Sequence, residues 1–197
     1  MSKLLYQGHG SYRVTTNGNF VIYIDPYAGD GYDIPADLIL VTHGHHDHNQ
    51  TGLVSRKPDC RIITHVEALA GGKHNTFDVG VVIIEAVTAE NIKHNPNECV
   101  GYILAFDGIT VYCSGDTSKT EQMSSFAKRK LDYALFPLDG IYNMDLEEGA
   151  ECARIVGAKH NVPIHIKPGE LFDADRARMW NAPDKLVVLP GETIELK

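Results

Sequence analysis

Four histidines and one aspartate are concentrated in the six-residue segment His43-Gly44-His45-His46-Asp47-His48. Neutral imidazole and carboxylate groups are the ligands that borderline divalent ions such as zinc prefer. In an extended chain His43 and His45 project to the same side, whereas Asp47 and His48 can turn toward a second point nearby. The spacing therefore predicts a metal site that serves two adjacent ions. His46 has no ligand role in this pattern, and we place it outside the metal contacts.

The element that must position this segment is the apolar run Leu38 to Val41, which directly precedes it. A strand that emerges from a core holds its end rigidly, and functional residues collect in the loops that follow such strands. The alternative is an exposed loop that happens to be rich in histidine. The buried strand immediately before the cluster favours the metal site.

Further strands are predicted on both sides of the cluster. Asn17-Gly18 and Asp107-Gly108 each separate two apolar segments and indicate hairpin turns. The apolar runs that we interpret as buried strands are Leu38 to Val41, Arg61 to Thr64, Val81 to Val87, Tyr133 to Phe136, Val162 to Ile166 and Leu186 to Leu189. Because the hairpins require antiparallel pairs, a sheet with only parallel strands fits less well.

Two helix starts are marked by capping-box spacing. Ser118 with Glu121, and Asp145 with Glu148, place an acceptor and a glutamate three residues apart. After the second start, apolar residues recur at helical spacing and predict a stripe that packs on a sheet. Mixed strands with a few covering helices predict an α/β sandwich.

The histidine cluster resembles the His-x-His-x-Asp-His signature of the metallo-β-lactamase superfamily. Other matching segments occur in the expected order: Gly8-His9-Gly10-Ser11, Tyr23-Ile24-Asp25-Pro26, Ser114-Gly115-Asp116-Thr117 and Val162-Pro163-Ile164-His165. Together they are most similar to the small branch that includes L-ascorbate-6-phosphate lactonase-like hydrolases. The resemblance implies a four-layer αββα sandwich with metals at one edge between two sheets. We find no domain boundary and treat residues 1–197 as a single domain.

Three further ligands follow from this resemblance and from their positions. Asp116 and His165 each follow an apolar strand, and the carboxylate of Asp116 could bridge two ions. His94 lies in the loop where the family places a third histidine, although the neighbouring spacing departs from the commonest pattern; His65 and His74 remain alternatives. The implied ligand set is His43, His45 and His94 on one ion, Asp47, His48 and His165 on the other, and Asp116 between them.

Two more residues in the matching segments could support this centre. His9 is either a donor beside the metals or simply a buried, hydrogen-bonded histidine. Asp25 could orient a ligand histidine, although an aspartate before proline is often only a strand terminator.

The implied activity is hydrolysis by a hydroxide that bridges two divalent ions, with Asp47 and Asp116 as catalytic residues. Zinc is the expected metal, and Mn²⁺ or Fe²⁺ stay open because ligand type alone does not fix the metal. Lys167 is a predicted anion contact, and Asn143 lies in a loop that borders the site in relatives. A small-molecule ester or lactone is the leading substrate class.

Three alternatives are retained. A phosphodiesterase on a small substrate would use the same hydroxide. A di-iron oxidoreductase of the same fold is less favoured because that branch usually has glutamate where this chain has His45. A metal-binding module without turnover is the third, and the complete ligand set argues against it.

Composition limits the partners and the location. The 197 residues carry a formal net charge of −8 and no long basic segment, which gives little electrostatic reason to bind nucleic acid. Neither a signal peptide nor a membrane-spanning stretch is apparent. The four cysteines form no Cys-x-x-Cys pair and fit reduced thiols. We therefore predict a cytoplasmic protein that acts on a small molecule, and the sequence carries no signal for an oligomeric state.

Overall fold

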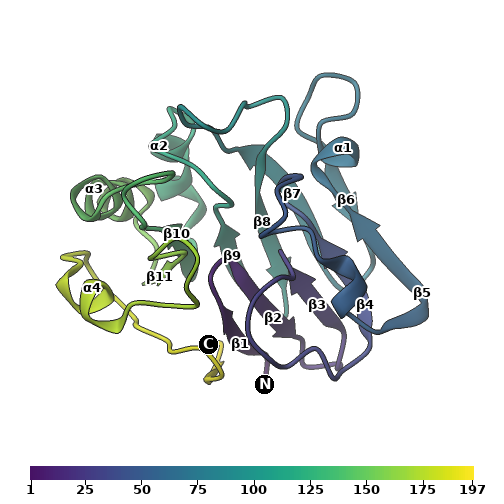
Figure 1. Ribbon diagram of the computed structural model, residues 1–197. Helices are drawn as coiled ribbons and strands as arrows, with labels where there is room; N and C mark the ends of the chain where they lie inside the picture. Colours follow the sequence, from purple (N-terminus) through teal and green to yellow (C-terminus); the bar gives the residue numbers. More distant parts are fainter.

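Two six-stranded sheets face each other in the computed structural model, which describes residues 1–197 (Figure 1). The first sheet has the order β12-β1-β2-β3-β4-β5, with bounds Thr193–Glu195, Lys3–Gly8, Ser11–Thr15, Val21–Ile24, Ala36–Leu40 and Arg56–Ile63. The second has the order β11-β10-β9-β8-β7-β6, with bounds His160–Ile164, Tyr133–Pro137, Ile109–Cys113, Val100–Phe106, Ile83–Thr88 and Thr76–Asp78. Both sheets are mixed: β3, β4 and β5 run parallel, as do β9, β10 and β11.

The core lies between the sheets because alternate residues of each strand point inward. In β3, Ile22 and Ile24 join a cluster of 26 buried residues from both sheets, whereas Val21 and Tyr23 belong to a separate cluster of six. Fully burying an aliphatic or aromatic side chain of this size contributes about 1.5–3 kcal/mol. The shared cluster therefore holds the two sheets face to face.

Helices cover the outer face of the second sheet. Helices α2 (Met123–Phe126), α3 (Leu146–Val156) and α4 (Ala174–Met179) gather on one side of the molecule (Figure 1). Their buried residues pack with outward side chains of β7 to β10 in a cluster of 18. The first sheet is covered more thinly: Val54, beside the short 3₁₀ helix η1 (Thr51–Leu53), joins its small outer cluster. The remaining helices are α1 (His65–Ala68) and η2 (Ala127–Arg129).

Both predicted hairpins are present. Asp107 and Gly108 have φ of 52° and 77° and join β8 to β9 as a two-residue turn of the type that Asp-Gly favours. The turn between β2 and β3 is longer than a tight Asn-Gly turn. In this turn the residue with left-handed backbone conformation is Asn19, with φ of 61°, and the N–H of Asn19 donates to the carbonyl of Thr16.

Five of the six apolar runs form or overlap strands, and the prediction for Leu186 to Leu189 is wrong. That segment meets β11 at a single bridge between Asn161 and Lys185. The N–H of Leu186 donates to the carbonyl of Asn161, but the next position of a parallel ladder would need an N–H from Pro163, which has none. The pairing therefore stops after one bridge.

The two helix-start predictions have different outcomes. Asp145 caps α3 and accepts from the N–H groups of residues 147 and 148, but the Glu148 side chain accepts from the N–H of Lys119 and does not complete a capping box. The start at Ser118 is wrong, since α2 begins at Met123 without a side-chain cap. Tertiary partners satisfy the amides of residues 118 and 119 instead. None of the helices combines the length and apolarity needed to cross a bilayer.

Candidate metal centre

The predicted ligands gather at one edge of the two sheets, where strands of both sheets end. His43 follows β4, Asp116 follows β9 and His165 follows β11. The sheets are joined at this edge, since the N–H of Val100 donates to the carbonyl of Thr42 at 3.0 Å. Because the parallel strands of each sheet end at the same edge, residues far apart in the chain meet there.

The first half-site consists of His43, His45 and His94. His45 Nδ1 lies 3.1 Å from His43 Nε2 and 3.2 Å from His94 Nε2. Ligand atoms around a tetrahedral zinc ion with Zn–N bonds of 2.0–2.1 Å are about 3.3 Å apart, so three nitrogens at this spacing fit one ion. The structure brings His94 to this group. Of the alternatives, His65 is half-buried and lines a cavity with these three histidines but joins no group of candidate ligands, and His74 is exposed in a loop.

The second half-site consists of Asp47, His48 and His165. Asp47 Oδ2 lies 4.0 Å from His48 Nε2 and 3.9 Å from His165 Nε2. Both Nε2 atoms are buried and have no hydrogen-bond partner. Buried polar atoms are rarely left unpaired, so these two lone pairs fit a cation between them. His46 is exposed and lies outside every group of candidate ligands.

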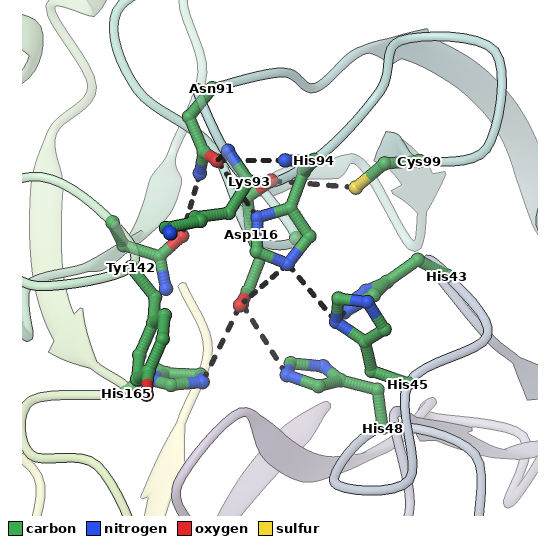
Figure 2. A network of polar contacts seen from close by, with 12 residues as sticks. His43, His45, His48, Asn91, Lys93, His94, Cys99, Asp116, Tyr142 and His165 are labelled. Atoms are coloured by element: carbon green, nitrogen blue, oxygen red, sulfur yellow. Dashed lines mark hydrogen bonds and ion pairs between the residues drawn. The ribbon is translucent and has the colours of Figure 1, made fainter.

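Asp116 lies between the two half-sites. Its Oδ2 is 3.4 Å from His94 Nε2 and 3.5 Å from His165 Nε2, and its Oδ1 is 3.4 Å from His48 Nε2 (Figure 2). One carboxylate therefore reaches histidines of both half-sites, which is the position that the sequence predicts for a bridging ligand.

The outer nitrogens of the second half-site histidines each meet a buried carboxylate. His48 Nδ1 lies 2.8 Å from Asp25 Oδ2, and His165 Nδ1 lies 3.2 Å from Asp139 Oδ2. Asp25 therefore orients a predicted ligand histidine, one of the two roles that its sequence position left open. Such partners fix the tautomer, which leaves Nε2 free to bind a metal.

The outer nitrogens of two first half-site histidines meet neutral groups. His43 Nδ1 lies 3.0 Å from Thr42 Oγ1, and His94 Nδ1 lies 2.9 Å from Asn91 Oδ1. In both cases the imidazole N–H has an oxygen acceptor, so Nε2 again faces the centre.

His9 supports the centre from the turn between β1 and β2. It is 2% exposed, and its Nε2 lies 3.1 Å from Asp47 Oδ2. It is therefore both buried and a partner of a predicted ligand. The next residue is Gly10, and a Cβ there would lie 2.8 Å from Cε1 of His48. The turn must therefore carry glycine at this position for His48 to keep its place.

Charge is distributed unevenly over the centre. Burial lowers the pKa of His43 to about 2 and keeps its imidazole neutral. Burial also lowers the pKa of His48, but the carboxylates of Asp116 and Asp25 outweigh it and raise the pKa to about 9. For Asp116 burial raises the pKa, yet the surrounding imidazoles, His165 first, hold it well below its usual range. The centre thus keeps an ionised carboxylate among histidines.

A cavity of about 260 Å³ opens onto both half-sites. Besides the ligands, it is lined by Lys93 and Tyr142. Lys167, a predicted substrate contact, does not line it and pairs with Glu170 Oε1 at 2.6 Å. Asn143, the other predicted contact, is 8% exposed and uses both polar atoms within the protein, so the structure does not bring it to the cavity.

Sequence reasoning missed four residues at this centre: Thr42, Asn91, Lys93 and Asp139. Asp139 carried a usable signal, because it follows the buried run Tyr133 to Phe136 as Asp116 follows its own strand. The other three had no distinguishing pattern. Their roles depend on the path of loops that the sequence does not specify.

Comparison with known proteins identifies the family. Residues 3–165 match the family described as the beta-lactamase superfamily domain. The chain belongs to the metallo-β-lactamase superfamily. The predicted metallo-β-lactamase sandwich is therefore confirmed, and the two mixed sheets with few helices agree with it.

Relatives of this metallo-β-lactamase-fold protein cover its whole length. A UPF0173 metal-dependent hydrolase from Geobacillus sp. is 30% identical over an alignment 227 positions long, which covers 98% of this chain and 100% of the relative. A structure from Parabacteroides distasonis, described as a metal-dependent hydrolase, is 29% identical with a TM-score of 0.77 and covers 94% of this chain and 92% of that one.

More distant structures share the fold alone. CmlA, a diiron β-hydroxylase from Streptomyces venezuelae, has a TM-score of 0.68 at 12% identity and covers 99% of this chain and 54% of that one. A diphosphatase of the PhnP family has a TM-score of 0.69 at 16% identity and covers 100% of this chain and 98% of that one. The same scaffold therefore carries different chemistries.

Proposed function

We propose that this metal-dependent hydrolase of the metallo-β-lactamase fold uses two divalent ions, zinc in first place, to cleave a small ester or lactone. The observation that carries the proposal is the carboxylate of Asp116, which contacts histidines of both half-sites at 3.4 to 3.5 Å. A mononuclear site would not need a carboxylate shared in this way. The hydrolase names of the relatives support the reaction class.

Bound metal ions would supply a water molecule of lowered pKa and would polarise the substrate oxygen. The first ion would be held by His43, His45 and His94, and the second by Asp47, His48 and His165, with Asp116 shared.

Asp47 is the proposed proton carrier. Its side chain is 38% exposed at the cavity, whereas that of Asp116 is only 5% exposed. Burial raises the pKa of Asp47, but the contact with His9 and the charge of His48 lower it below its usual range, so the carboxylate is ionised at neutral pH. Because His9 occupies Oδ2, we assign the transfer of a proton from water to the leaving oxygen to Oδ1.

The cavity favours a small, anionic substrate. Lys93 is the one lysine or arginine that lines it, and no carboxylate lies within ion-pair distance of its Nζ. In Figure 2 its side chain extends from the loop beside His94 toward Tyr142. A carboxylate or phosphate on the substrate could therefore pair with Lys93 while the reacting bond lies over Asp116.

The test combines metal analysis with a substrate panel. Protein reconstituted with zinc, manganese or iron is analysed for metal content and assayed against lactones, thioesters and phosphodiesters. Two ions per chain with turnover of a lactone or ester supports the proposal. Turnover confined to phosphodiesters would select the phosphodiesterase alternative. Protein that is inert to every ester but reduces oxygen with an electron donor would select the di-iron alternative.

A further inference from the structure

The buried histidines of the two half-sites are connected behind the metal centre. Asn143 lies between the groups that orient His165 and His94. Its Nδ2 donates to Asp139 Oδ2 at 2.8 Å, and its Oδ1 accepts from Asn91 Nδ2 at 3.2 Å. Since Asp139 contacts His165 and Asn91 contacts His94, one chain of polar contacts joins a histidine of each half-site.

The direction of donation along this chain is fixed at every step. The His94 Nδ1–H donates to Asn91 Oδ1, which also accepts from the N–H groups of Lys93 and His94. The Asn91 amide then donates to Asn143, and the Asn143 amide donates to Asp139, which ends the chain as an acceptor-only carboxylate. Reversal of either amide would place two acceptors together. Each histidine is thereby held with Nε2 toward the metals.

The chain is buried, so its members constrain one another. Asn143 is 8% exposed and Asp139 is 5% exposed. Three backbone N–H groups of the loop, from residues 141 to 143, donate to Asp139 Oδ1 and fix that carboxylate independently of the Asn143 side chain. Removal of the Asn143 amide therefore breaks the middle of the chain, while His165 and His94 keep their own immediate partners.

We infer that Asn143 is a positioning residue that couples the two metal half-sites. An ion at the second half-site orders His165 and Asp139, and through Asn143 it orders Asn91 and His94. An ion that binds afterwards at the first half-site then meets histidines that are already ordered, so its binding costs the protein less conformational entropy. This inference rests on the proposed function of a dinuclear centre.

A second link between the half-sites runs through Asp25, whose Oδ2 accepts from Thr42 Oγ1 and meets His48. Asp25 also accepts from the backbone N–H of Thr42 at 2.7 Å and so joins the ends of β3 and β4. A change there would disturb the sheet as well. Asn143 makes no such strand contact and is the better residue to test.

The experiment measures stepwise metal binding and does not depend on turnover. Metal-free wild type, Asn143→Ala and Asn143→Asp are titrated with Co²⁺ and followed by the visible spectrum and by calorimetry. Asn143→Asp keeps the size of the side chain and the acceptor for Asn91 but cannot donate to Asp139. Asn97→Ala is the matched control, because that side chain bonds only within its own exposed loop.

Coupling between two sites typically changes affinity by about 5- to 150-fold. For one hydrogen bond between two amides and one from an amide to the carboxylate of Asp139, we expect about 5- to 10-fold. In both Asn143 variants the ratio of the first to the second dissociation constant should therefore fall by about that factor. Both variants should still bind two ions. Asn97→Ala should match wild type. Should Asn143→Ala fail to fold, Asn143→Asp provides the same comparison.

Two outcomes separate the inference from the proposed function. Wild type that binds two ions, with an unchanged ratio in a folded Asn143 variant, overturns the coupling and leaves the proposed function standing. Wild type that binds a single ion overturns the dinuclear function itself.

Discussion

Gly10 gives a sharp test of how the fold holds its second half-site. A Cβ at this position would lie 2.8 Å from His48 Cε1 and 3.2 Å from its Nδ1, whereas ordinary contact begins near 3.4 Å. The His48 ring must therefore move by at least about 0.6 Å, three times the roughly 0.2 Å within which metal–ligand distances are held. The φ of Gly10 is not positive, so the backbone itself accepts alanine.

The ring has little freedom to move. It is 1% exposed, and its Nδ1 is held 2.8 Å from Asp25. Loss of that contact costs about 1.5–3 kcal/mol for a hydrogen bond to a charged group. Changes that misorient a metal-bound histidine typically cost about 10- to 100-fold in metal affinity. Gly10→Ala should thus weaken the second half-site by at least tenfold and leave the first nearly unchanged.

The assay is competition with a chromophoric chelator, together with metal analysis and thermal unfolding of the metal-free protein. Gly44→Ala is the matched control, since it lies between two ligands but its Cβ would meet only His65, at 3.6 Å. At a free metal concentration that just fills both sites of the wild type, we expect one ion per chain in Gly10→Ala and two in Gly44→Ala. If Gly10→Ala binds both ions as tightly as wild type, His48 is not the ligand that the geometry assigns.

Three further predictions test the centre and its scaffold. Asp116→Asn should weaken both ions by tenfold or more, whereas His46→Ala should keep normal metal content; equal loss in both, by metal analysis, would contradict the ligand assignment. Lys93→Ala should raise KM about tenfold more for anionic than for neutral substrates, the mark of a lost charge contact, and Lys167→Ala should not; the opposite result in steady-state kinetics would favour the contact predicted from sequence. Partial burial raises the pKa of Asp132, but a neighbouring lysine and threonine have the larger, opposite effect, so the pKa lies below its ordinary value. The ionised side chain therefore contributes stability above the ordinary aspartate pKa, and this contribution is lost as pH falls through the lowered pKa. In urea unfolding of metal-free protein between pH 2 and pH 5, Asp132→Asn should therefore show a shallower loss of stability than wild type, and identical slopes would refute it.

The ligand cluster could be predicted because its signal is local. Imidazoles at positions 43, 45 and 48 follow a buried strand, and strand and ligand are contiguous in sequence. His165 and Asp116 could be placed for the same reason. The hairpin at Asp107-Gly108 was equally local, because the turn type depends on two adjacent residues.

The failures share a dependence on distant partners. The run Leu186 to Leu189 has the composition of a strand, but Pro163 on the neighbouring strand ends the pairing. Ser118 has the spacing of a cap, but its own N–H donates to the carbonyl of Glu90 and the next N–H donates to Glu148, partners that lie far away in the sequence. Lys167 lies two residues after His165, and Asn143 lies in a loop that was expected to border the site; in the structure Lys167 pairs with Glu170 at the surface and Asn143 bonds within the core. Periodicity and spacing do not encode these tertiary contacts.

Three buried residues of the centre have strained backbone conformations and side chains that already have partners within the protein. His9, Asp25 and His165 have φ of 53°, 46° and 44°, conformations that cost about 1–3 kcal/mol each and persist only where the surroundings over-determine them. His9 and Asp25 contact the predicted ligands Asp47 and His48, and His165 is a predicted ligand that Asp139 holds, so we expect none of the three to contact a substrate.

Under the proposed function, we expect substrate choice to depend on side chains that do not help to hold the histidines. Lys93 and Tyr142 line the cavity, are exposed, and come from the two loops that also carry Asn91, Asp139 and Asn143, but the side chains of Lys93 and Tyr142 make none of the contacts that orient the histidines. Exposed loop positions tolerate substitution far better than a strained, buried cluster does. We therefore expect that replacement of Lys93 or Tyr142 changes which substrate is accepted and leaves the positions of the histidines undisturbed.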